Sequence, residues 1–119
     1  MIEVTFAGMI YMVSLMGCYD GDTCTIRFEN SPAPIEVQKI RFADFDTPEI
    51  KGKCDREKEL AIKARDVTRA YMQETGKITL SGKRGRYGRL LSYAPALRQR
   101  LIEEGLGRPY DGGRRMGWC

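Results

Sequence analysis

Hydrophobic and polar positions alternate along the first third of the chain, which is the pattern of half-buried β-strands. Residues 3–19 are mostly β-branched, aromatic or methionine, with Gly8 and Gly17 as the expected bend points of one long strand. The segment 20–23 contains an Asp-Gly step and predicts a hairpin turn, because glycine tolerates positive φ. Alternation resumes over residues 23–29 and predicts the second strand.

The middle of the chain predicts a third strand and a long helix. A proline-rich turn at 30–34 leads into a strand over residues 35–45, and Pro48 stops it. The helix is expected to start with Asp55 as its N-cap and to end at Gly76. Its apolar stripe consists of Leu60, Ala64, Val67 and Tyr71.

The last third predicts two further strands, at 77–80 and 88–93, joined by a loop rich in glycine and arginine at 81–87. Pro95 suits the first turn of a second helix, which Gly105 ends. Five strands with a helix after the third and a second helix near the end are typical of a five-stranded OB-type barrel, a mainly β (α+β) fold. An antiparallel meander with a helix would fit the same order of elements.

Composition narrows the chemistry. With 119 residues, 42% of them apolar, residues 3–119 are expected to form one globular domain. The excess of 20 Lys and Arg over 16 Asp and Glu gives a net charge of +4, which favours polyanionic partners. Histidine is absent, so catalysis would have to use carboxylates, Arg, Lys, Tyr, Cys or a bound metal.

Residues 1–17 are apolar but lack the basic start and the cleavage site of a signal peptide, and no apolar run is long enough to span a membrane. We therefore expect a strand there, and no membrane partner. The cysteines lack the paired spacing of a zinc site and could form two disulfides, one or none. They are Cys18, Cys24, Cys54 and Cys119.

Acidic residues gather at two of the predicted turns. Asp20 and Asp22 flank the first hairpin, and Asp46 and Glu49 follow the third strand. If the first and third strands end at the same rim, Asp22 and Asp46 can converge on one cation, and such hard oxygen ligands suit Ca²⁺. Taken singly, each segment is better explained as a turn former, because Asp is common in turns.

Arginines lie near these acids in the sequence. Arg41 precedes Asp46 by five residues, and the segment 83–89 concentrates four cations around Tyr87. Alone, a strand arginine or a basic loop is often only a solvated surface feature. Together with a cation that neutralises a phosphate oxygen, two guanidinium groups could clamp a phosphodiester while Glu49 orients or deprotonates water.

Three motifs then resemble the staphylococcal nuclease (thermonuclease) family in sequence, order and spacing. They are D-G-D-T at 20–23, R-x-x-x-x-D-T-P-E at 41–49 and Y-G-R at 87–89. The resemblance covers residues 12–110, which is most of the chain. It implies an OB-fold enzyme that hydrolyses DNA and RNA by Ca²⁺-dependent attack of water at phosphorus, and we expect it to act as a monomer.

The resemblance also implies a metal site. Asp22 and Asp46 would be direct ligands of Ca²⁺, and the backbone carbonyl of Thr47 would be a third. Asp20 would be an acid of the outer coordination sphere.

The same resemblance implies roles toward the substrate. Arg41 and Arg89 would hold the scissile phosphate, and Glu49 would orient the attacking water or act as the general base. The residues expected to contact the remaining nucleotide are Arg86, Tyr87 and Tyr110.

The segments 52–54 and 108–119 look like a bacterial branch of the family, in which Cys54 and Cys119 would pair. The alternative is two free thiols in a cytoplasmic protein; the missing signal favours the cytoplasm, and a Cys54–Cys119 disulfide would favour an exported form.

One departure from the family lies at 93–97, where the chain passes straight from the fifth strand into a helix and omits a hairpin that other members have at this rim. Closure of the barrel is therefore in question. Two alternatives to the enzyme stand beside it: a non-catalytic OB-fold module that binds nucleic acid, and a small disulfide-stapled interaction protein.

Overall fold

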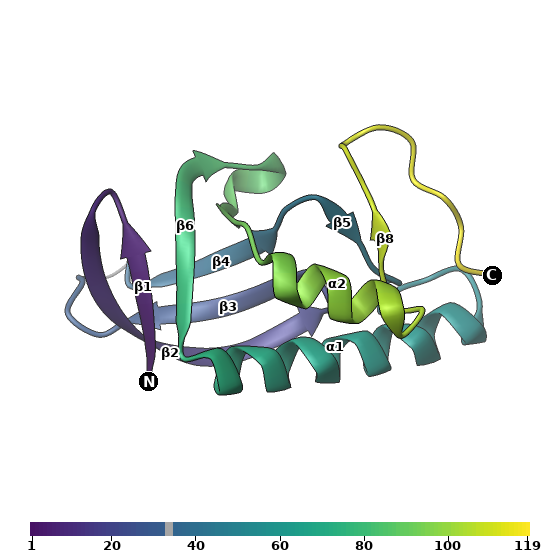
Figure 1. Ribbon diagram of the computed structural model, residues 1–119, viewed down its shortest axis with the longest axis horizontal. Coiled ribbons are helices and arrows are strands. Elements are labelled where there is room, and N and C mark those ends of the chain that lie inside the picture. Colours follow the sequence, from purple (N-terminus) through teal and green to yellow (C-terminus); the bar gives the residue numbers. More distant parts are fainter. Residues whose placement is uncertain (33–34) are drawn as a thin grey trace.

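The computed structural model describes residues 1–32 and 35–119, apart from the side chain of Arg86, and contains a closed β-barrel with two helices packed against it (Figure 1). The strand order is β1-β2-β3-β4-β7-β6, and parallel pairing of β1 with β6 closes the barrel. These strands are β1 (Ile2–Phe6), β2 (Met9–Asp20), β3 (Thr23–Phe28), β4 (Val37–Phe42), β6 (Lys77–Arg84) and β7 (Leu90–Ser92). The mainly β, α+β class is confirmed, and the barrel is OB-like.

The predicted number of five barrel strands is wrong, because the segment expected to be one long strand folds back on itself. Ala7 and Gly8 both have positive φ, 53° and 77°, and form a tight turn between β1 and β2. The two strands then pair in antiparallel fashion, with Ile2 opposite Val13. An alanine rarely occupies the left-handed region, so the sequence signals a bend at Gly8 and not a hairpin.

The barrel is closed although the chain passes, as predicted, straight from β7 into the second helix. Short β7 pairs with β6 on one side and, in parallel, with β4 on the other, so no further strand is needed there. The third predicted strand is shorter than expected: β4 ends at Phe42, Asp44 takes a φ of 74°, and the chain continues as β5 (Phe45–Asp46), which pairs with β8 (Arg108–Pro109). The last two residues of the turn predicted at 30–34 lie outside the described residues.

Helix α1 (Asp55–Thr75) runs along the lower side of the molecule in the view of Figure 1 and packs mainly against β2. Gly76 ends it with a φ of 62°, as predicted, but the N-cap is Cys54 and not Asp55. Cys54 has an extended backbone, and its sulfur accepts the Glu57 N–H at 3.4 Å. Small or slender side chains face the barrel, so that the axis lies close to the sheet; they are Ala61, Ala64, Thr68 and Met72. The predicted stripe flanks this line: Leu60, Val67 and Tyr71 are half-buried.

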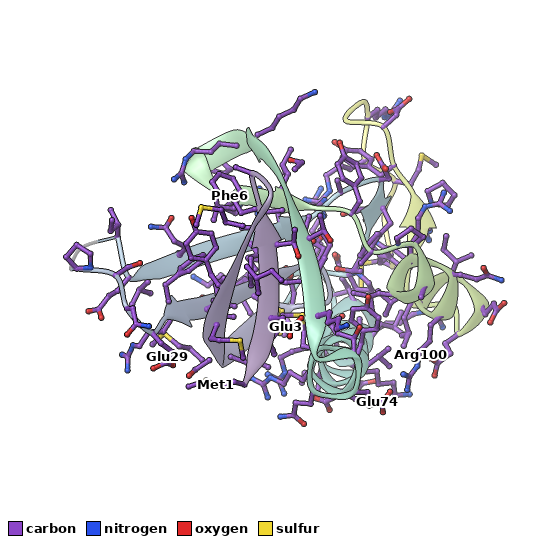
Figure 2. All side chains as sticks on the ribbon, turned by 60° about the vertical axis from the view of Figure 1, so that its left-hand side comes forward. Met1, Glu3, Phe6, Glu29, Glu74 and Arg100 are labelled. Carbon is purple, nitrogen blue, oxygen red and sulfur yellow. A yellow bond between two sulfur atoms is a disulfide. The ribbon has the colours of Figure 1, made fainter. Side chains whose placement is uncertain are left out.

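The core fills the barrel and the space under α2 (Pro95–Glu103), which begins with its proline in the first turn. Its completely buried members include Val4, Ile26, Phe42, Leu97 and Leu101. Burial of each such side chain stabilises the fold by about 1.5–3 kcal/mol. An ion pair of 3.4 Å between Arg100 and Glu74 joins α2 to the end of α1 (Figure 2).

Two disulfides are present, and no cysteine of the described chain is free. Cys18–Cys24 links two residues that face each other across β2 and β3. Cys54–Cys119 links the start of α1 to the last residue, at a sequence separation of 65, and is the pairing that the family resemblance implied. Over residues 1–32 and 35–119, no helix has the length and apolar character needed to cross a membrane.

Candidate functional site

A pocket of about 510 Å³ opens at the end of the barrel where the β2–β3 turn, the segment after β4 and the segment after β6 meet. Most of the residues expected to carry the chemistry line it, namely Asp20, Asp22, Arg41, Glu49, Tyr87, Arg89 and Tyr110. Asp46 and Thr47 lie buried in the segment next to it. The side chain of Arg86 lies outside the described residues. The structure thus gathers three separated motifs at one rim.

The two acidic turns are held together by close packing around Gly21. A Cβ at Gly21 would lie 2.8 Å from the Thr47 side chain and 2.9 Å from that of Ala64, so only glycine fits. Thr68 of α1 donates through its hydroxyl to the Gly21 carbonyl at 2.6 Å, and the Asp22 carbonyl accepts the Phe42 N–H at 2.8 Å. The turn that carries Asp22 is therefore fixed against the segment that carries Asp46 and Thr47.

The acids at this rim are unusually buried for charged residues. Asp20, Asp22 and Asp46 expose only 7%, 5% and 3% of their surface. Burial, followed by the charge and hydrogen bond of Asp22, raises the pKa of Asp20 to about 8. Asp22 is the better compensated of the two, because Arg41 lies 3.3 Å from its Oδ2 and Thr23 donates to its Oδ1 at 2.9 Å. Two adjacent buried carboxylates repel each other, and a nearby cation would stabilise both.

This donor set fits a hard cation such as Ca²⁺. Asp22, Asp46 and the Thr47 carbonyl offer only oxygen ligands, and the buried Thr47 hydroxyl has no hydrogen-bond partner. Within residues 1–32 and 35–119, no cluster of three or more His, Cys, Asp or Glu side chains surrounds one point. Oxygen donors of this kind do not suit zinc, whose structural sites use nitrogen and sulfur ligands.

The two predicted phosphate-binding arginines are positioned differently. Arg41 is anchored: its guanidinium donates to the carbonyls of Phe42 and of Phe45, the latter at 3.1 Å, and its side chain is only 15% exposed. Arg89 donates to the Thr23 hydroxyl at 3.2 Å and lies 5.6 Å from the centre of the Tyr87 ring. Thr23 accepts from Arg89 and donates to Asp22, a link for which the sequence assigned no role.

Tyr87 is presented by a compact turn that follows β6. The strand continues to Arg84, so the predicted loop at 81–87 starts later than expected, and the short 3₁₀ helix η1 (Arg86–Gly88) follows it. Tyr87 and Gly88 have φ values of 64° and 74°, and the Gly85 N–H donates to the Arg89 carbonyl at 2.7 Å. Tyr87 is 85% exposed as a result, which leaves its ring available for stacking.

Glu57, in the first turn of α1, holds the backbone of Glu49 in position. The buried Glu57 carboxylate accepts the N–H groups of Glu49 and Lys53, each at 3.1 Å. A Cβ at Gly52 would lie 2.5 Å from the Glu57 side chain, so the loop closes tightly around it. The signal for this role is its place at the third position of α1, where a glutamate commonly folds back onto the preceding loop.

The largest omission of the sequence-based site is Arg115. Its guanidinium forms ion pairs with Asp46 and Glu49 and lines the pocket. Partial burial lowers the Arg115 pKa, but the hydrogen bonds and charges of Asp46 and Glu49 outweigh this and raise it above its ordinary value. No local sequence pattern predicts these contacts, because Arg115 lies in a glycine-rich basic segment that is distant in the sequence from Asp46 and Glu49. Tyr93 and Asp44 also line the pocket without having been predicted.

Tyr110 lines the pocket, and two of its polar groups form hydrogen bonds to nearby backbone carbonyls. Its N–H donates to the Asp44 carbonyl at 3.1 Å, and its hydroxyl donates to the Gly113 carbonyl at 2.8 Å. These bonds orient the ring at the start of the final segment.

No family model matches the chain, and no curated protein is found to be similar to it.

Proposed function

We propose that this chain is a Ca²⁺-dependent nuclease of the staphylococcal nuclease type, which hydrolyses phosphodiester bonds of DNA, RNA or both. The observation that carries the proposal is the convergence of buried acids, two arginines and Glu49 from three distant segments on one pocket. Turns with a purely structural role do not require two buried carboxyl groups. Arginines with a purely solvated role do not require a position next to such carboxyl groups. The combination is what an active site for an anionic ester requires.

Asp22, Asp46 and the Thr47 carbonyl would hold the cation, with Asp20 in its outer coordination sphere. When bound, Ca²⁺ supplies charge neutralisation on the phosphate. Arg41, anchored by backbone carbonyls, would present its remaining N–H groups to the phosphate, and Arg89 would bind it from the other motif. Glu49, about half exposed at the pocket, would orient water or accept its proton.

The exposed aromatic ring of Tyr87 and the ring of Tyr110 would stack on bases, and Arg86 would contact a further phosphate. The net charge of +4 supports a polyanionic substrate. We propose a monomer, and two disulfides favour an oxidising compartment over the cytoplasm expected from the missing signal.

The test is cleavage of plasmid, single-stranded DNA and RNA by the purified protein with Ca²⁺, followed by excess chelator. We expect cleavage that stops when Ca²⁺ is removed. Glu49→Gln should lower the rate about 10²- to 10⁴-fold, whereas Glu59→Gln, on an exposed position of α1, should leave it unchanged. Tight binding without cleavage would overturn the enzyme and indicate the non-catalytic OB-fold module.

A further inference from the structure

The final segment of the chain brings a positive charge to the acids of the pocket. Arg115 NH2 lies 2.5 Å from Asp46 Oδ1, and Arg115 NH1 contacts Glu49 Oε1. Asp46 is almost completely buried, while the Arg115 side chain is 43% exposed. The guanidinium thus bridges a proposed metal ligand and the proposed water-orienting carboxylate.

The segment is anchored on both sides of Arg115. Before it, β8 pairs with β5, which places Arg108 opposite Asp46 itself. After it, the buried Trp118 ring stacks under the Arg108 guanidinium at 3.8 Å, and Arg108 donates to the Gly117 carbonyl at 2.7 Å. In Figure 1 the yellow final segment runs from β8 back to the start of α1, where Cys119 is bonded to Cys54. Residues 111–117 between these anchors are exposed and irregular.

A guanidinium and a divalent cation compete for Asp46 Oδ1, because the two positive charges repel each other when both approach the same oxygen. Anchoring the segment keeps Arg115 at a high effective concentration next to that oxygen. Loss of one anchor would lower this concentration without removing the arginine. The Cys54–Cys119 disulfide is the anchor that a change of redox environment could remove.

We propose that Arg115 is a built-in competitor for the cation site, held there by the Cys54–Cys119 disulfide, so that Ca²⁺ must displace it from Asp46 and Glu49. The inference rests on the proposed function, since it assumes that Asp46 is a ligand. It predicts that Ca²⁺ binds more tightly when Arg115 is removed and when its tether is cut.

Calorimetric titration of Ca²⁺ into Arg115→Ala tests this without an activity assay. The Kd should fall roughly three- to tenfold, the range expected for removing a partly exposed guanidinium that is paired with two carboxylates. Arg114→Ala removes the same charge from the neighbouring exposed residue and should change the Kd much less. Arg115→Lys keeps the charge but not the planar group that bridges Asp46 and Glu49, and should give an intermediate value.

The double variant Cys54→Ser/Cys119→Ser tests the tether while it leaves Cys18–Cys24 intact, and serine can still cap α1. We expect the Kd of the double variant to fall less than that of Arg115→Ala. Combining the double variant with Arg115→Ala should give the same Kd as Arg115→Ala alone. Additive effects would show that the disulfide does not act through Arg115. Equal Kd values for Arg114→Ala and Arg115→Ala would overturn the inference alone, whereas no saturable Ca²⁺ binding by any variant would overturn the proposed function and the inference together.

Discussion

The buried carboxylate of Glu57 holds the backbone of Glu49, whose N–H it accepts at 3.1 Å. Its other oxygen accepts the Lys53 N–H, also at 3.1 Å. Because Glu57 lies in the first turn of α1, the loop that carries Glu49 is positioned by the helix and not only by the strand that precedes it. A residue outside the pocket thereby controls where a proposed catalytic carboxylate lies.

Replacing Glu57 by Ala should lower the free energy of unfolding by about 1–3 kcal/mol, since two backbone donors lose their partner. It should also lower the nuclease rate, because Glu49 is released. Urea denaturation and the plasmid assay measure the two effects. Glu57→Gln keeps a side-chain acceptor and should rescue part of both, and Glu59→Ala on the exposed face should change neither. Equal stability of the Glu57→Ala and Glu59→Ala proteins would contradict this role.

Gly21→Ala should destabilise the protein by about 1–3 kcal/mol, because the added methyl group overlaps Thr47 and Ala64 in a packed contact. Thermal unfolding followed by circular dichroism provides the measurement. Gly117→Ala is the matched control, because a Cβ there meets nothing within 4 Å. A Gly21→Ala protein as stable as the control would mean that the two acidic turns are not packed as described.

Arg41→Ala and Arg89→Ala should each lower the cleavage rate by about 10²- to 10³-fold, because each removes charge stabilisation from the phosphate. Their stabilities should differ. Arg41→Ala removes the partner of buried Asp22 and two bonds to backbone carbonyls, and should cost about 1–3 kcal/mol. Arg89→Ala should cost less, and Arg56→Ala, exposed on α1, should affect neither quantity. A fully active Arg89→Ala enzyme would show that the phosphate binds elsewhere.

Tyr87→Ala should weaken binding of a single-stranded oligonucleotide by about 1–3 kcal/mol, the value of one base stacked on an aromatic ring. Its stability should hardly change, since the side chain is 85% exposed. Fluorescence anisotropy in a Glu49→Gln background, where cleavage does not interfere, measures the affinity. Tyr19→Ala, at a ring 53% exposed on β2, is the control and should bind normally. Equal affinities would remove Tyr87 from the substrate surface.

Much of the fold could be predicted because the relevant signals are local. Alternation predicts β3 and β4, helical spacing with Gly76 predicts α1, and the proline at its start predicts α2. The turn between β1 and β2 escaped prediction because it uses an alanine with positive φ, a conformation that tertiary pairing stabilises against the residue's own preference.

Local motifs identify many of the side chains that line the pocket, namely the acids of two turns, Arg41, Arg89 and Tyr87. How these side chains are held depends on contacts between distant segments. The Glu57 bonds to the loop, the Gly21 contact with Thr47 and the Arg115 bridge to Asp46 join residues that local preference does not relate. Such contacts form because packing of the barrel, α1 and the Cys54–Cys119 disulfide brings distant segments together, and a pattern read over a few neighbouring positions does not contain that information.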